Sequence, residues 1–181
     1  MSVRRRRCRA IVLAVPFAAV VTLAVARQDS QSSAEITFPN GYRSWTRVKS
    51  TLVGPDAPGF ATNGGLHHFY ANERAVDGYR SGAFPDGAIL IDDLLELKPL
   101  GSGTSGEGSR RRLAVMVKDG RRFADTGGWG FEVFKADARE GSLSRDGRTA
   151  CYDCHKKADD GVFSSLSGAL LESRQTGRAS R

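Results

Sequence analysis

The chain has 181 residues and a formal net charge of +7, and 40% of its residues are hydrophobic. Five of the 27 basic residues lie in the first 26 positions, which hold no acid, so the rest of the chain carries 22 basic and 20 acidic residues. That near balance excludes the strongly basic surface with which proteins bind nucleic acid or an anionic membrane. About 155 residues remain after the first 26, enough for one domain with a single hydrophobic core.

The first 26 residues have the three parts of a secretory signal. Five arginines precede an apolar run from Ala10 to Val25, and the small residues that end at Ala26 form an A-x-A cleavage site. We therefore expect export to the periplasm or otherwise out of the cytoplasm, with the mature chain starting at Arg27. An uncleaved membrane anchor is the alternative, although a run of about 16 residues is short for a membrane span.

The remaining chain divides into three parts by composition. Residues 27–38 are mostly polar and predict a disordered N-terminal segment. Residues 39–173 are predicted to form the folded domain, which opens with a Pro-Asn-Gly turn. Residues 174–181 are basic and polar and predict a disordered tail.

The first half of the domain predicts two strands and a short helix. Residues 45–53 and 66–71 have the apolar and β-branched content of strands. The helix is predicted over Glu73–Ser81, because Asn72 suits the N-cap and Gly82 suits the position after the last helical residue.

A Phe-Pro-Asp-Gly turn at residues 84–87 leads into a mostly apolar strand, residues 88–97. Two acids stand in this strand, and alternation places Asp93 on one face with Ile89 and Ile91, and Asp92 on the other face. The sequence does not reveal which acid is buried. Residues 101–109 are rich in Gly and Ser and predict a mobile loop.

The strongest strand pattern lies at residues 112–118. Leu113, Val115 and Val117 fall on one face, and Arg112, Ala114 and Met116 fall on the other. An Asp-Gly turn follows this strand.

The last third of the domain predicts a further strand at residues 129–134, a polar loop at 137–149 and a short helix at 163–173. Together the elements indicate an α+β fold that is rich in β structure, with an antiparallel sheet and short helices. The all-helical pattern of small electron-carrying cytochromes is absent.

The most informative motif is Cys151-Tyr152-Asp153-Cys154-His155 near the C-terminus. C-x-x-C-H is the attachment sequence of a c-type haem: each thiol bonds one vinyl group, and the adjacent imidazole ligates the iron. We expect one covalent haem c held by Cys151 and Cys154, with His155 as the metal ligand. A thioredoxin-like pair would need a βαβ context, and a zinc site would need a second Cys/His pair.

The position of this motif bears on the sixth iron ligand. No methionine follows His155, and Met116 is the only methionine after the predicted signal. The sixth position is therefore open, or it is filled by Met116, His67 or His68. An open position suits the binding of a small ligand, whereas a filled one suits electron transfer. His67 and His68 are adjacent on a predicted strand and should point to opposite faces.

From about Asn40 to Phe163, the chain resembles the cytochrome P-460 family, which includes hydroxylamine-oxidising cytochromes P-460 and gas-binding cytochromes c′-beta. The matching stretches are Tyr42-Arg43-Ser44-Trp45, Tyr70-Ala71-Asn72, Phe84-Pro85-Asp86-Gly87, Val117-Lys118-Asp119, Arg122-Phe123-Ala124, Gly128-Trp129-Gly130-Phe131, the haem motif and Val162-Phe163-Ser164. The resemblance implies a β-rich α+β fold, a homodimer, and a five-coordinate haem with His155 as its proximal ligand.

Two departures from the family pattern concern the haem pocket. Asp92 stands where the P-460 enzymes carry the lysine that is bonded to the porphyrin, and Ala114 stands where they carry a distal glutamate. Both changes argue against hydroxylamine oxidation, because the covalent link and the proton acceptor are missing at these positions. The candidate distal-pocket residues are Phe84, Asp92, Ala114, Met116 and Phe131.

These observations predict an exported mono-haem c-type cytochrome with an open distal site. It would bind a small diatomic ligand such as nitric oxide, take part in redox chemistry, or do both. The alternatives are an electron-transfer cytochrome c with an unidentified redox partner protein, and a hydroxylamine-oxidising enzyme. The sequence leans away from an enzyme; if it is one, it is an oxidoreductase that acts on a small nitrogen compound or peroxide.

Overall fold

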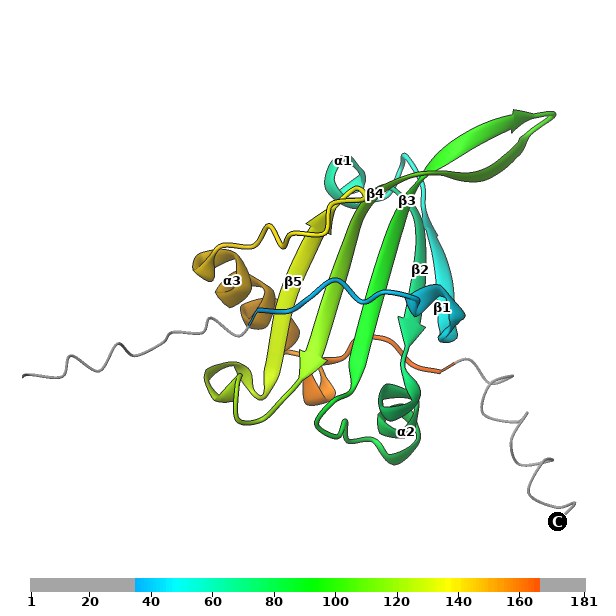
Figure 1. The fold of residues 1–181 in the computed structure, drawn as a ribbon. Helices are drawn as coiled ribbons and strands as arrows, with labels where there is room; N and C mark the ends of the chain where they lie inside the picture. The colour runs from blue at the N-terminus through cyan, green and yellow to red at the C-terminus, as the bar shows by residue number, and fades with distance from the viewer. Residues whose placement is uncertain (1–34, 167–181) are drawn as a thin grey trace, which may run out of the picture. The chain divides into compact units, whose positions relative to one another are not determined.

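A computed structural model describes residues 35–166, in which five antiparallel strands form one sheet in the order of the sequence (Figure 1). The strands are β1 (Thr46–Val53), β2 (Gly65–Ala71), β3 (Ile89–Gly101), β4 (Thr104–Lys118) and β5 (Trp129–Lys135). The helices are α1 (Phe60–Asn63), α2 (Glu73–Ser81) and α3 (Arg145–His155), with 3-10 turns η1 (Tyr42–Ser44), η2 (Ala124–Thr126) and η3 (Asp159–Gly161). The predicted β-rich α+β fold is confirmed.

Helix α2 forms where its capping residues predict it. The Asn72 side chain accepts a hydrogen bond from the backbone N–H of Ala75 at 2.9 Å, and Gly82 follows the helix in the left-handed region at φ +81°. These contacts satisfy backbone groups that would otherwise be unpaired at each helix end.

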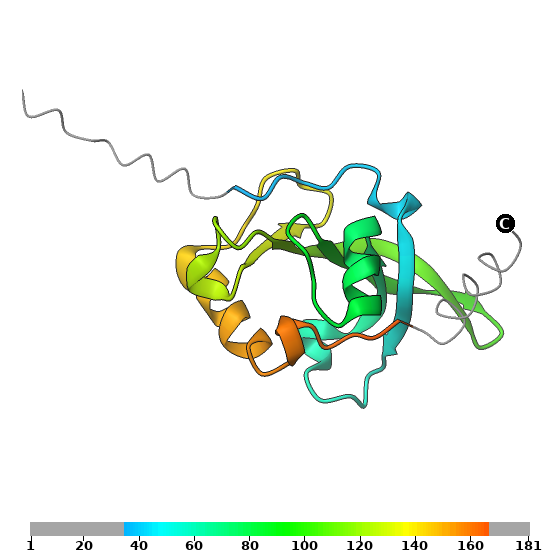
Figure 2. The same ribbon diagram turned by 90° about the horizontal axis from the view of Figure 1, so that it is seen from below.

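The two faces of the sheet support separate hydrophobic clusters. Figure 2 shows chain segments covering both faces of the sheet. On one face, residues from about Ile36 to Trp45 pack over strand residues that include Leu113 and Phe134. On the other face, α3 and the chain after it cover Leu90 and Phe131. The sheet is therefore the middle layer of the domain.

The N-terminal boundary of the folded part lies before the predicted one. Ile36 is buried, and the rings of Phe38 and Phe134 are 5.2 Å apart. Residues 35–38 are therefore part of the packed domain, while residues 1–34 and 167–181 lie outside the described part. The predicted signal segment and basic tail fall there.

The prediction of a mobile loop at residues 101–109 is wrong. Strands β3 and β4 continue past the sheet as a hairpin arm (Figure 1), which turns at Ser102-Gly103 and pairs Pro99 with Ser105 and Leu97 with Glu107. The turn needs glycine, because Gly101 and Gly103 have φ angles of +92° and +75°. Leu100 on this arm is 63% exposed.

Two further predictions near the C-terminus are wrong. Residues 145–149, predicted as part of a loop, begin helix α3. The predicted helix at 163–173 does not start as expected, since residues 163–166 form no helix; the rest of it lies outside the described residues. Within residues 35–166, no helix has the length and apolar character needed to cross a membrane.

Candidate functional site

A cavity of about 570 Å³ lies between the sheet and α3. Its lining is mainly apolar and includes Phe69, Leu90 and Phe131 from the sheet, with Cys151 and His155 from α3. Cofactor sites in proteins typically enclose about 300–1,000 Å³ and combine apolar walls with a few polar groups. The cavity therefore has the size and character of a cofactor site.

Helix α3 brings the Cys-x-x-Cys-His motif to this cavity. Ser144 is the N-cap of the helix, and its side chain accepts a hydrogen bond from the N–H of Gly147 at 3.1 Å. Cys151 and Cys154 are three residues apart, so they lie about one helical turn from each other, and they form no disulfide. Cys151 lines the cavity and Cys154 is exposed.

A buried carboxylate anchors α3 to the edge of the sheet. Glu132 of β5 accepts hydrogen bonds from Arg148 at 2.6 Å and from the N–H of Leu143 at 2.8 Å. Burial alone would raise the pKa of Glu132, but these hydrogen bonds outweigh burial and lower it. The carboxylate is thus ionised where it fixes the helix that carries the motif.

The imidazole of His155 is oriented by a backbone carbonyl. Its Nδ1–H donates to the Gly161 carbonyl at 2.7 Å, because a carbonyl oxygen can only accept. This hydrogen bond leaves Nε2 as the nitrogen that a haem iron would take. The rings of Phe131 and Phe163 lie 5.2 and 5.3 Å from the imidazole and restrict its movement.

Asp160 fixes the turn that carries this carbonyl. Its side chain accepts hydrogen bonds from Lys118 at 2.6 Å and from the N–H of Phe84 at 2.8 Å. The indole N–H of Trp129 donates to the Asp160 carbonyl at 2.7 Å. Sequence reasoning missed Asp160, because these contacts join residues that lie 31 to 76 positions away along the chain.

The opposite wall of the cavity consists of strand residues that lie side by side. Met116 of β4 lies between its strand partners Leu90 of β3 and Phe131 of β5. In the neighbouring row of the same face, Asp92 of β3 is the partner of Ala114 of β4. Four of the five candidate pocket residues, Asp92, Ala114, Met116 and Phe131, line the cavity.

Phe84, the fifth candidate, does not line the cavity. It packs against Tyr79 and Trp129, with ring centroids 5.0 and 5.5 Å apart. Phe84 therefore supports the turn that holds Gly161, and the predicted contact of its ring with the pocket is not found.

The two neighbouring acids of β3 have different environments. Asp92 is on the cavity face, with 20% of its side chain exposed, whereas Asp93 is fully buried on the other face. The Nδ1–H of His67 donates to Asp92 at 2.8 Å, and its Nε2–H donates to the Asn63 carbonyl at 2.8 Å. The hydrogen bond to Asp92 raises the pKa of His67, which burial opposes.

His67 and His68 point to opposite faces, as the strand pattern predicts. Both nitrogens of His67 are engaged, so His67 has no lone pair for iron. His68 contacts Ser50 at 2.6 Å and Glu107 at 2.8 Å on the face away from the cavity. Of the three candidate sixth ligands, Met116 alone lines the cavity.

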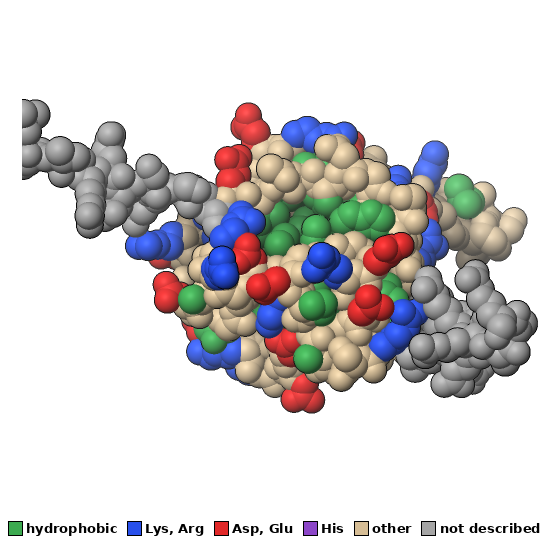
Figure 3. Space-filling view, turned by 60° about the horizontal axis from the view of Figure 1, so that its bottom comes forward, with side chains coloured by type: hydrophobic (Ala, Val, Ile, Leu, Met, Phe, Trp, Pro, Cys, Tyr) green, Lys and Arg blue, Asp and Glu red, His purple; other side chains and the backbone are tan. Residues whose placement is uncertain are grey.

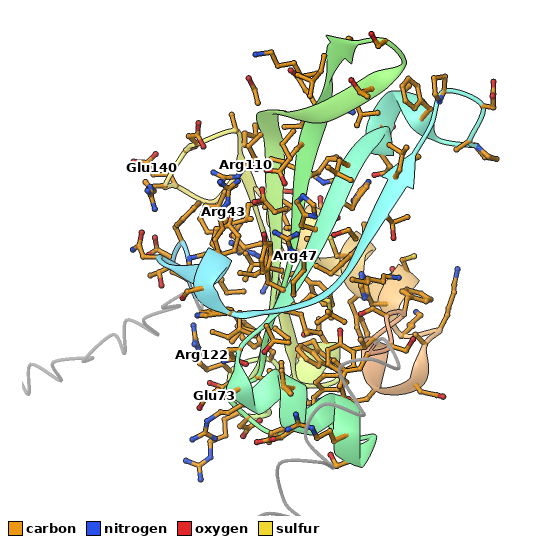
Figure 4. All side chains as sticks on the ribbon, turned by 90° about the vertical axis from the view of Figure 1, so that its right-hand side faces the viewer. Arg43, Arg47, Glu73, Arg110, Arg122 and Glu140 are labelled. Carbon is orange, nitrogen blue, oxygen red and sulfur yellow. The ribbon has the colours of Figure 1, made fainter. Side chains whose placement is uncertain are left out.

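Asp93 is the centre of a buried charge network on the far face of the sheet. It accepts hydrogen bonds from Arg110 at 2.7 Å, from Arg43 at 3.0 Å and from the Tyr42 hydroxyl. Figure 4 shows Arg43 on η1 and Arg110 on β4 on the same side of the sheet. Burial, together with Asp93, raises the pKa of Tyr42 to about 12. The network attaches η1 to the sheet.

A second, smaller hollow of about 250 Å³ lies on this far face and is lined by apolar residues that include Ile36, Trp45 and Ile89. Figure 3 shows hydrophobic side chains gathered in a hollow surrounded by charged side chains. This hollow contains no residue of the Cys-x-x-Cys-His motif, so it is separate from the candidate cofactor site.

The residues around the larger cavity fit a haem, because a free imidazole nitrogen and a thiol open onto an apolar space of sufficient size. Residues 39–164, which contain all of these groups, match the Cytochrome P460 family. No curated protein matches the chain. With most of its length matched, the chain belongs to the Cytochrome P460 family and is a haem-binding cytochrome.

Proposed function

We propose that the protein is an exported mono-haem c-type cytochrome that binds a small diatomic ligand, such as nitric oxide, at an open distal site. One observation carries this proposal: neither His67 nor His68 reaches the cavity that receives His155, and of the three predicted sixth ligands only Met116 is among its described, mainly apolar lining residues. An iron held by His155 would then keep a position for an exogenous ligand.

The covalent attachment would use the motif on α3. Cys151 and Cys154 would each bond one vinyl group, and His155 would ligate the iron through Nε2, since its Nδ1–H is held by Gly161. The haem supplies an iron that binds diatomic molecules. The protein's part is to orient the imidazole and to keep an apolar space around the open position.

Export is part of the same proposal. C-type haem is attached outside the cytoplasm in bacteria, and the first 26 residues have the composition of a cleavable signal. The proposed location is the periplasm or another exported compartment, with the mature chain starting at Arg27.

Replacing His155 with alanine tests the axial-ligand role. The two thioether bonds should persist in His155→Ala, so covalent haem content should stay close to wild type. The affinity of the reduced protein for carbon monoxide and nitric oxide should change at least about tenfold, because the ligand on the opposite side of the iron is lost. Absorption titrations of the reduced protein measure this affinity.

Asp153→Asn serves as the control, because Asp153 is exposed between the two cysteines and pairs with Lys156 at the surface. It should bind both gases like wild type. Unchanged gas affinity in His155→Ala would contradict the assignment of His155 as the proximal ligand.

The second candidate function is electron transfer, and the position of Met116 on the cavity wall is the observation that favours it. In that case Met116 would fill the sixth position and exclude added ligands. Hydroxylamine oxidation is disfavoured, because the lysine that cross-links the porphyrin in the P-460 enzymes is replaced by Asp92.

We also propose a homodimer, as the family resemblance implies. Strand β1 pairs only with β2, so it is an edge strand of the described sheet, and Leu52 on it is 59% exposed. An open strand edge and exposed apolar side chains are features that a second copy can cover. Sedimentation equilibrium should give about twice the chain mass at micromolar concentration. A monomer at all concentrations would contradict this proposal.

A further inference from the structure

Asp92 is a carboxylate in an otherwise mainly apolar cavity wall. It lies on β3 between Phe69 of β2 and Ala114 of β4, which are its partners across the sheet. Ala114 has only a methyl side chain, so it leaves the space beside the Asp92 carboxylate open. The same cavity receives His155.

Two neighbouring side chains, His67 and Arg112, hold the Asp92 carboxylate in place. His67 donates to its Oδ1 at 2.8 Å, and the second ring nitrogen of His67 donates to the Asn63 carbonyl. Since both partners of this ring are acceptors, His67 satisfies both only as the imidazolium cation. The Arg112 guanidinium adds a second positive charge, 3.8 Å from Oδ2.

One oxygen of Asp92 remains available. No hydrogen bond to Oδ2 occurs among the described residues, because 3.8 Å is too long for one. The other charged groups around the cavity are Lys49, Arg112 and Glu132, and Arg148 already pairs with Glu132. Asp92 is thus the one carboxylate on the described cavity wall with a free acceptor oxygen.

We propose that Asp92 is the proton acceptor of this cavity for protic ligands, meaning weak acids HX that bind ferric iron as the anion X⁻. When the H–X bond breaks, its proton would pass to Oδ2 of Asp92, and X⁻ would keep the electron pair and serve as the ligand for the iron that a bound haem would supply. His67 and Arg112 position the carboxylate. The inference rests on the proposed haem site with His155 as ligand, and it extends the ligands of that site beyond neutral diatomic gases.

The test compares a protic ligand with an aprotic one on the holoprotein. Hydrogen cyanide is undissociated near neutral pH and must lose its proton on binding, whereas carbon monoxide has none to lose. Asp92→Asn keeps the shape of the side chain and an oxygen that can accept from His67, but it is not a base. We expect its association rate with hydrogen cyanide in the ferric state to fall by about 10²-fold or more, and its rate with carbon monoxide in the ferrous state to stay within about threefold of wild type.

Two variants complete the experiment. Asp92→Glu keeps a carboxylate and should retain most of the hydrogen cyanide rate, and Asp125→Asn removes an exposed acid outside the cavity and should have no effect. A hydrogen cyanide rate for Asp92→Asn close to wild type overturns the inference. If the association rates of Asp92→Asn with hydrogen cyanide and with carbon monoxide fall equally, the inference is also overturned, because that result shows a change in the shape of the pocket. A wild-type protein that binds neither ligand refutes the proposed haem site itself, and the inference with it.

Discussion

Replacing Cys151 and Cys154 together with alanine is expected to abolish covalent haem. Cys151 lines the cavity and Cys154 follows about one helical turn later, and in the proposed c-type site each would bond one vinyl group of the porphyrin. Without the thiols, only the bond from His155 and apolar contacts would retain a haem. The wild-type mass should equal the chain from Arg27 plus one haem, and the double variant should give the apoprotein mass.

Acid–acetone extraction gives the same comparison without mass spectrometry. Haem should stay with wild-type protein, should be partly lost from either single variant, and should be extracted completely from the double variant. Cys8→Ala is the matched control, because Cys8 lies in the predicted signal and should not affect haem content. Haem that resists extraction from the double variant would show that other residues form the covalent link.

Asp93→Asn is expected to destabilise the protein strongly, although it changes a single side chain on the far face of the sheet. The Asp93 side chain is fully buried, and its partner Arg110 is only 11% exposed. Neutralising the carboxylate removes the buried counter-charge of the Arg110 guanidinium, and breaking such buried pairs costs about 3–5 kcal/mol of unfolding free energy. Urea denaturation followed by circular dichroism measures this loss.

Asp137→Asn is the matched control for Asp93→Asn, because Asp137 also contacts Arg110, at 2.6 Å, but is 85% exposed. Solvent screens that pair, so the control should lose less than about 1 kcal/mol. Similar losses in the two variants would contradict the account of Asp93 as the centre of the network.

The stability contributed by Asp93 should depend on pH in a defined direction. Burial alone would raise the pKa of Asp93, but hydrogen bonds from Arg110, Tyr42 and Arg43 outweigh it and lower the pKa below its ordinary value of 3.8. A carboxyl whose pKa is lower in the folded state stabilises fully above its unfolded pKa and progressively less below it. The stability difference between wild type and Asp93→Asn should therefore be constant near neutral pH and should shrink as the pH falls below about 4.

Local signals in the sequence were sufficient to predict several helices and strands. Helix α2 has the predicted bounds because both of its ends depend on adjacent residues, Asn72 and Gly82. The alternation in residues 112–118 gave the two faces of β4 correctly, since Leu113 and Val115 are in the far-face cluster and Ala114 and Met116 line the cavity. In both cases the determining contacts are close in sequence or follow the strand period.

Other elements depend on contacts that the local sequence does not carry. The hairpin arm is rich in Gly and Ser, which weaken a strand signal, and its order comes from pairing between β3 and β4. The start of α3 could have been recognised from Ser144 and from Asp146 in the first turn. Its attachment through Glu132 and Arg148 could not, because these residues meet only in the folded chain.

In the candidate site too, some features could be predicted from the sequence, and others depend on contacts between distant residues. The Cys-x-x-Cys-His motif follows from the sequence pattern, and the pocket candidates Asp92 and Ala114 came from the family resemblance. The pairing of His67 with Asp92 and the contacts of Asp160 that fix the turn at Gly161 were not predicted. The alternation of side chains along the strand correctly placed Asp92 and Asp93 on opposite faces of the sheet. Which of the two acids is buried depends on contacts of Asp93 with Arg110 and Tyr42, which come from distant parts of the chain.

The absorption spectra of the purified protein test the central claim most directly. If the distal site is open, the ferric form should have a high-spin c-type spectrum, the ferrous form should bind carbon monoxide at once, and Met116→Ala should leave both spectra unchanged. A low-spin spectrum in both oxidation states that is lost on Met116→Ala, with no carbon monoxide binding in the wild type, would contradict the open site. That result would show instead an electron-transfer cytochrome with Met116 as the sixth ligand.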